Sequence, residues 1–208
     1  FPEDNVYRLG GDEFVVVVER KGNQDLSALG KRMVVAISKP IAINGATVEI
    51  GASIGFARIP EDSAFPAEAI QYSDCAMYAA KKIGRNIVKA FVPEMQEELI
   101  NKIQMEADLK LAMKLGKIRP HYQPLVDLKT QEIVGYEALA RWEREPGKFV
   151  SPCEFIPLAE NAGLIVELTD QLFRIACRDA LSWAPHTVLS FNISPVQLSD
   201  RLLGLRLL

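Results

Sequence analysis

Two carboxylates follow two glycines near the start of the sequence. Gly10 and Gly11 separate two strand-forming runs and are followed directly by Asp12 and Glu13. Glycines in this place indicate a hairpin turn, because both positions can adopt positive φ without a Cβ clash. A turn without side chains lets a ligand reach backbone N–H groups, and carboxylates are the hard ligands that Mg²⁺ takes beside phosphates. The residues indicate either a nucleotide site or an acidic hairpin tip that faces water.

Two cations follow near the end of an expected helix. Lys81 and Arg85 are four residues apart, which places them on one helix face near its end. There they could hold phosphate oxygens. The alternative is a basic helix end that complements the helix macrodipole.

A further set of polar residues belongs to the second half of the sequence. Strand alternation over residues 133–142 places Glu137 and Arg141 on one face, and the strand expected at 188–194 carries Asn192 on its polar face. Polar residues near strand ends form the site of a (β/α) barrel at its C-terminal face. The alternatives are a simple salt bridge between Glu137 and Arg141 and an amphipathic sheet with one wet face.

The elements that must position these residues alternate between strands and helices, which predicts an α/β fold. Ser151 and Glu154 predict a capping box for the helix that starts there. Helices are expected at 26–38, 67–83, 93–116, 151–162 and 164–184, and strands at 1–9, 14–18, 41–43, 47–56, 87–91, 121–128, 133–142 and 188–194.

Composition narrows the class of protein. The sequence is 49% hydrophobic and 25% charged with a net charge of −3, so a nucleic-acid polymer is not the expected partner. No apolar run is long enough to span a membrane, and we expect no membrane contact by this stretch. Three widely spaced cysteines indicate reduced thiols and a cytoplasmic location. A longer parent protein would still have room for a membrane or sensory domain upstream.

The run 9–14, the segment 52–55 and the helix 74–86 resemble, in this order and spacing, the C-terminal half of a GGDEF diguanylate cyclase domain. The resemblance implies a palm-like sheet on which two GTP molecules are condensed to cyclic di-GMP across a homodimer. It implies that Gly10 and Gly11 lie against the guanine nucleotide, and that Glu13 is catalytic and binds Mg²⁺ or Mn²⁺. Lys81 and Arg85 would hold the terminal phosphates.

The same family carries an Arg-x-x-Asp motif for product inhibition ahead of the glycines. Asp4 stands at the Asp position of this motif, whereas Phe1 stands at the Arg position. A phenyl ring cannot make the bidentate contacts of a guanidinium group, so we expect no product inhibition through this site.

Residues 122–124, 137–142, 152–165 and 191–194 resemble the N-terminal part of an EAL phosphodiesterase domain. The resemblance implies a TIM-type barrel that hydrolyses cyclic di-GMP to the linear dinucleotide with Mg²⁺ or Mn²⁺. It implies that Glu137 is catalytic and binds the metal together with Asn192. Arg141 would contact a phosphate, and Gln123 would lie beside the nucleotide.

We therefore expect a partial GGDEF domain at 1–92, a helical linker at 93–107 and a partial EAL domain at 108–208, as a piece of a longer protein. The expected function of the parent is cyclic di-GMP turnover, principally hydrolysis by the EAL domain, with a GGDEF domain that acts as a cyclase or senses GTP. The piece alone is expected to be inactive because parts of both sites are missing. The alternative is a non-catalytic receptor or scaffold that binds cyclic di-GMP or GTP.

Overall fold

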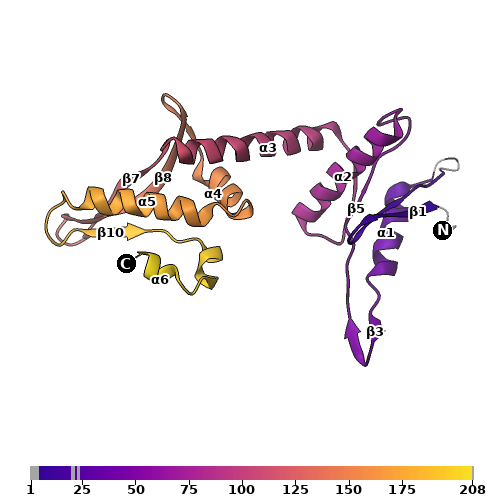
Figure 1. Cartoon of the computed structure of the whole chain (residues 1–208), viewed down its shortest axis with the longest axis horizontal. Helices are drawn as coiled ribbons and strands as arrows, with labels where there is room; N and C mark the ends of the chain where they lie inside the picture. Colours follow the sequence, from indigo (N-terminus) through magenta and orange to yellow (C-terminus); the bar gives the residue numbers. More distant parts are fainter. Residues whose placement is uncertain (1–4, 20–21, 23, 208) are drawn as a thin grey trace. The chain divides into compact units, whose positions relative to one another are not determined.

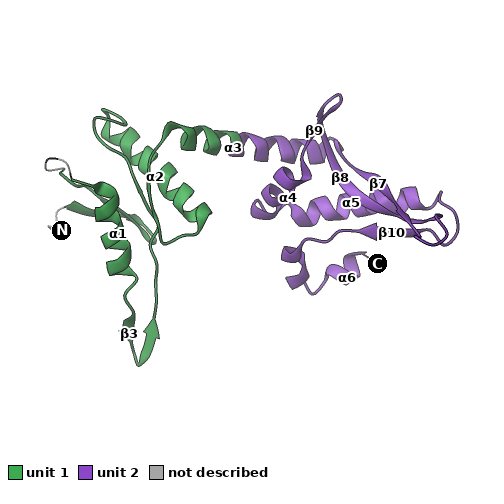
Figure 2. Ribbon diagram, turned by 180° about the vertical axis from the view of Figure 1, so that it is seen from behind, with its two compact units in different colours: residues 1–101 green, residues 102–208 purple. Residues whose placement is uncertain are grey.

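The structure is a computed structural model that describes residues 5–19, 22 and 24–207 (Figure 1). Phe1 and Asp4, which carry the expectation about product inhibition, lie outside these residues. The chain forms two compact units, 1–101 and 102–208 (Figure 2). No helix in the described ranges combines the length and apolarity that crossing a membrane requires.

A strand–helix–strand motif forms the centre of the first unit. Strands β5 (Ile54–Phe56) and β6 (Val88–Ala90) pair in parallel, and helix α2 (Pro66–Ile83) connects them and packs against both. The helix approaches β5 so closely that a Cβ atom on Gly55 would lie 2.1 Å from the backbone N of Met77 and the carbonyl O of Ser73. Glycine at position 55 is therefore a requirement of packing.

Helix α1 (Leu26–Ile37) packs on the same motif. Asp25 begins the helix by accepting a hydrogen bond from the Ala28 backbone N–H over 3.1 Å. Leu29 and Val34 are buried, and a Cβ atom on Gly30 would lie 2.7 Å from the Val88 side chain. The helix expected at 26–38 is thus confirmed.

Two short hairpins form separate two-stranded sheets in the first unit. They are β1 (Val6–Gly10) with β2 (Glu13–Val16), and β3 (Ile41–Ile43) with β4 (Ala46–Val48). The continuous strand expected over 47–56 is wrong, because residues 49–53 belong to no strand. Alternation of apolar residues does not make a strand where the backbone has no ladder partner.

Helix α3 (Pro93–Lys114) contributes to both hydrophobic cores. Met95 and Leu99 pack on the first-unit core around Phe91, and Leu109 and Met113 belong to the core of the second unit. The long helix expected here is confirmed. The assignment of residues 93–107 as a linker remains a prediction.

The second unit contains an open sheet with the strand order β10-β8-β7. Strand β7 (Ile118–Val126) is antiparallel to β8 (Ile133–Glu145), β10 (Val188–Phe191) is parallel to β8, and β9 (Lys148–Val150) forms a hairpin with the end of β8. Helices α4 (Pro152–Asn161) and α5 (Ile165–Ala180) lie between β8 and β10 in the chain, and η2 (Pro195–Ser199) and α6 (Leu203–Leu207) follow. This is the expected α/β class.

The capping box expected at Ser151 and Glu154 is wrong. Ser151 is the N-cap of α4, but its side chain makes no capping hydrogen bond. Pro152 begins the helix, and the Glu154 backbone N–H bonds to the Ser151 carbonyl oxygen over 2.9 Å instead. A capping box is found at η2, where Ser194 and Gln197 exchange hydrogen bonds.

Candidate functional site

The glycine turn of the first unit is open to a ligand. Gly11 has φ +51°, and a Cβ atom on Gly10 or Gly11 would meet nothing within 4 Å. The Arg8 guanidinium group spans the turn and donates from Nε (3.0 Å) and Nη2 (2.8 Å) to the Gly11 carbonyl oxygen. Arg8 fixes the turn, and sequence analysis missed this role. The predicted hairpin is confirmed.

Glu13 begins β2 and is exposed. It forms no hydrogen bond or ion pair with Lys81 or Arg85 among the described residues. The expectation that the two cations share a helix face is wrong, because α2 ends at Ile83 and Gly84 is its C-cap. Arg85 follows in the left-handed region with φ +57°. The four-residue spacing applies only while the helix continues.

Three polar positions of the second unit form a row across the sheet. Gln123 on β7 and Ser190 on β10 are both register partners of Glu137 on β8. Directly opposed residues place their side chains on the same face of a sheet. Gln123 is exposed and Glu137 is half-buried.

The Asn192 side chain reaches Glu137 just after β10 ends. Its Nδ2 donates to Glu137 Oε1 over 2.7 Å, although 55 residues separate the two. The predicted convergence of Glu137 and Asn192 is thus confirmed as geometry, whereas the strand expected over 188–194 is wrong beyond Phe191, and Asn192 follows its end. The alternative salt bridge with Arg141 is not formed, since Arg141 Nη1 donates to the Ala140 carbonyl oxygen over 2.9 Å.

Arg141 and Asn192 line one cleft, whereas Glu137 and Gln123 do not belong to its lining. Its other lining residues are mainly apolar: Pro120, Ala138, Leu139, Ala140, Pro152, Ile156, Leu172 and Phe191. A half-buried guanidinium group at such a cleft is suited to meet an anionic ligand in a setting of reduced solvent screening.

Glu137 and Asn192 provide two hard oxygen donors at one point, which fits a Mg²⁺ or Mn²⁺ ion in chemical type. Ligation by Asn192 requires its amide to turn so that Oδ1 replaces the donating Nδ2. No group of three His, Cys, Asp or Glu residues that could hold a metal exists within the described residues. Further ligands would have to be water, phosphate oxygens or residues of another kind.

A polar network behind Asn192 was missed by sequence analysis. Ser194 Oγ donates to Glu160 Oε1 over 2.6 Å, and the Gln197 Oε1 atom accepts from Thr169 Oγ1 over 3.0 Å and from the Ser194 backbone N–H over 3.3 Å. The Ser-x-x-Gln spacing of residues 194–197 is a capping signature and could have revealed half of it.

Helix α5 covers the opposite face of the sheet. Tyr122 donates to Asp179 Oδ2 over 2.6 Å, and its ring meets Trp183 edge-on with centroids 5.1 Å apart. Burial and the hydrogen bond to Asp179 raise the pKa of the Tyr122 hydroxyl above its ordinary value. Around Tyr122 this face is closed by packing, whereas the Glu137 face carries the exposed Gln123 side chain and is open to a ligand.

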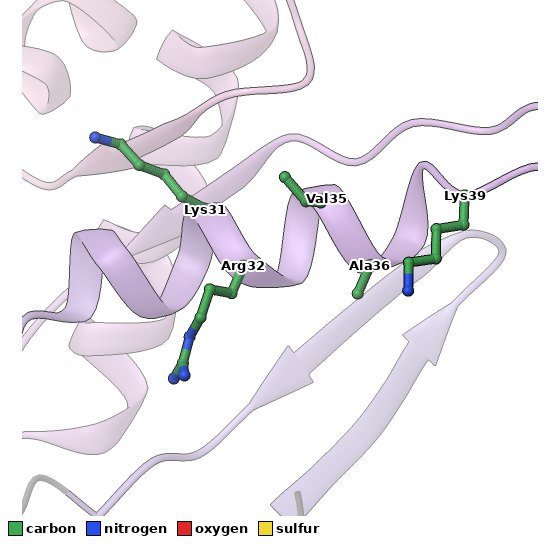
Figure 3. A pocket seen from close by; sticks show the side chains of 5 residues that line it. All are labelled: Lys31, Arg32, Val35, Ala36 and Lys39. Atoms are coloured by element: carbon green, nitrogen blue, oxygen red, sulfur yellow. The ribbon is translucent and has the colours of Figure 1, made fainter.

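A separate hollow lies on α1 and is lined by Lys31, Arg32, Val35, Ala36 and Lys39 (Figure 3). None of the predicted site residues belongs to it. The side chains of Lys31 and Arg32 point in different directions, so these two cations do not converge on a common anion.

Comparisons with known proteins divide the chain as the two units do. A model of the diguanylate cyclase GGDEF domain matches residues 2–87, and a model of the EAL domain matches 106–207. The bifunctional diguanylate cyclase/cyclic di-GMP phosphodiesterase MucR of Pseudomonas aeruginosa is 36% identical over 92% of this chain and 28% of its own length. The cyclic di-GMP phosphodiesterase NbdA of the same organism is 33% identical over 86% of this chain and 23% of its own length.

Among solved structures, a MucR phosphodiesterase in complex with c-di-GMP shares 31% identity and a TM-score of 0.48, covering 50% of this chain and 44% of that one. The chain spans about a quarter of the length of the curated relatives it matches, with 24%, 28% and 24% of the first three covered.

Proposed function

Because the chain belongs to the GGDEF–EAL proteins, with a GGDEF region followed by an EAL region, we propose that the whole protein turns over cyclic di-GMP and hydrolyses it through its EAL half. The single observation that carries this proposal is the contact of Asn192 with Glu137 on the open face of the sheet. Asn192 connects this contact to the cleft that Arg141 also lines.

Each residue has a role in this proposal. Glu137 and Asn192 hold Mg²⁺ or Mn²⁺, which when bound supplies a hydroxide nucleophile near neutral pH and offsets phosphate charge. Arg141 holds a phosphate oxygen of cyclic di-GMP by charge-assisted hydrogen bonds. Gln123 contacts the nucleotide from the neighbouring strand, because it shares the row of Glu137.

In this proposal the GGDEF half binds GTP, either as a cyclase or as a sensor. Gly10 and Gly11 approach the guanine nucleotide of GTP, Glu13 binds Mg²⁺ or Mn²⁺, and Lys81 and Arg85 hold the terminal phosphates. The open turn braced by Arg8 supports this assignment. We propose further that the protein acts as a homodimer in the cytoplasm, since cyclase chemistry joins two GTP molecules from two half-sites.

The test is hydrolysis of cyclic di-GMP by the whole protein with Mg²⁺ or Mn²⁺, followed by chromatography of the linear product. Glu137→Gln removes the charge of a proposed ligand and keeps its shape, so kcat/KM should fall at least 100-fold. Glu132→Gln makes the same change at an exposed position before β8 and should leave the rate unchanged. If the wild-type protein binds cyclic di-GMP but does not hydrolyse it, the receptor function is favoured over the enzyme. If it neither binds nor hydrolyses cyclic di-GMP, the scaffold function is favoured.

A further inference from the structure

We propose that Glu160, Thr169, Ser194 and Gln197 form a positioning network that holds Asn192 in place as a metal ligand. This inference rests on the proposed function of the EAL half. None of the four residues touches the metal in this account. They act on the segment between β10 and η2, from which Asn192 reaches across to Glu137.

The network ties this segment to two helices. Ser194 Oγ donates to Glu160 Oε1 on α4 (2.6 Å), and the Ser194 backbone N–H donates to Gln197 Oε1 (3.3 Å). Gln197 Oε1 also accepts from Thr169 Oγ1 on α5 (3.0 Å). Ser194 is thus held through both its side chain and its backbone, two residues beyond Asn192.

The burial of the network argues for a role beyond stability. Gln197 is 1% exposed and Thr169 is 5% exposed. The Gln197 Nε2 atom is buried without a hydrogen-bond partner. A buried amide with an unsatisfied donor costs free energy that an apolar side chain of similar volume avoids. The part of Gln197 that is satisfied is Oε1, the atom that fixes the Ser194 backbone.

The position of Ser194 explains why this restraint matters for Asn192. Residues beyond Phe191 have left the strand ladder, so the sheet no longer fixes their backbone. A metal ligand must be held near its productive geometry by neighbours whose own positions are fixed. Loss of such partners weakens metal affinity about 10- to 100-fold in other metalloproteins.

The experiment uses the whole protein with Glu13→Gln in every variant, because Glu13 is the proposed metal ligand of the GGDEF half. It measures Mn²⁺ binding by the electron paramagnetic resonance signal of free Mn²⁺, and the Mn²⁺ dependence of hydrolysis. Ser194→Ala should weaken Mn²⁺ binding about 10- to 100-fold. The rate at saturating Mn²⁺ should recover most of the wild-type value, because Glu137 and Arg141 are unchanged. Ser194→Thr keeps a hydroxyl group and should bind Mn²⁺ closer to wild type.

The matched control is Ser199→Ala. Ser199 lies in the same η2 helix and donates to the Val196 carbonyl oxygen over 3.0 Å, yet it has no link to Asn192. Its removal should leave Mn²⁺ binding unchanged. Thr169→Val changes a second residue of the network and keeps nearly the same side-chain volume. It should also weaken Mn²⁺ binding, and it provides the test if Ser194→Ala does not fold.

If both Ser194→Ala and Thr169→Val bind Mn²⁺ as tightly as the wild type, the inference is overturned. The proposed function still stands in that case, provided that the wild-type protein hydrolyses cyclic di-GMP. Equal weakening by Ser199→Ala would also overturn it, since the effect would then come from general loosening of η2. A wild-type protein that neither binds Mn²⁺ nor hydrolyses cyclic di-GMP would overturn both the inference and the proposed function.

Discussion

Replacing Gly55 by alanine should loosen the strand–helix–strand motif of the first unit. The added Cβ would lie 2.1 Å from two backbone atoms of α2, Met77 N and Ser73 O. Ordinary contacts are about 3.5 Å or longer, so the helix must retreat by roughly 1 Å or more. Neither clashing atom belongs to a flexible side chain. Overpacking of this kind costs about 1–3 kcal/mol.

Hydrogen exchange followed by mass spectrometry measures this cost locally in the whole protein. A loss of about 1–3 kcal/mol predicts roughly 5- to 150-fold faster exchange for the α2 amides. Gly204→Ala is the control, because a Cβ atom there would meet nothing within 4 Å. Exchange of α2 in Gly55→Ala within twofold of wild type would refute the packing argument.

Two further predictions concern one residue in each unit. Glu13→Gln should lower Mg²⁺-dependent GTP affinity at least tenfold in calorimetry, whereas Asp12→Asn should not. Equal GTP affinity of the Glu13 variant and the wild type would favour the alternative interpretation, in which the hairpin is an acidic tip that faces water. Tyr122→Phe should destabilise the protein by about 1 kcal/mol at pH 7 through loss of the bond to Asp179. Because the pKa of Tyr122 is raised in the folded protein, its hydroxyl ionises at a lower pH in the unfolded chain than in the folded one. The contribution of this hydroxyl to stability is therefore full below about pH 10 and declines as the pH rises further. Urea unfolding monitored by tryptophan fluorescence should therefore show the gap between wild type and Tyr122→Phe narrowing from pH 7 to pH 11, and a constant gap would contradict this reasoning.

The parts of the fold and site that the sequence predicts are those set by local rules. The hairpin follows from Gly10 and Gly11, whose turn conformation needs no tertiary contact. The meeting of Glu137 with Asn192 follows in part from the parallel pairing of β8 and β10, which sets Ser190 beside Glu137 two residues before Asn192.

The parts that could not be predicted are contacts between residues far apart in the sequence and the exact ends of helices and strands. The Glu160–Ser194 and Thr169–Gln197 contacts span 34 and 28 residues, and no sequence period relates such positions. Arg85 was misplaced because the four-residue spacing was applied past Gly84, although the helix expected at 67–83 already ends before it. The strand over 47–56 was overextended because apolar alternation says nothing about the availability of a partner strand.

The most direct test of the metal assignment is crystallographic. Crystals of the whole protein with Mn²⁺ and cyclic di-GMP would locate the ion by its anomalous scattering. The account predicts a peak within about 2.6 Å of both a Glu137 carboxylate oxygen and Asn192 Oδ1, with the amide turned from its present donor orientation. A Mn²⁺ peak elsewhere, with the 2.7 Å hydrogen bond from Asn192 to Glu137 intact, would contradict it.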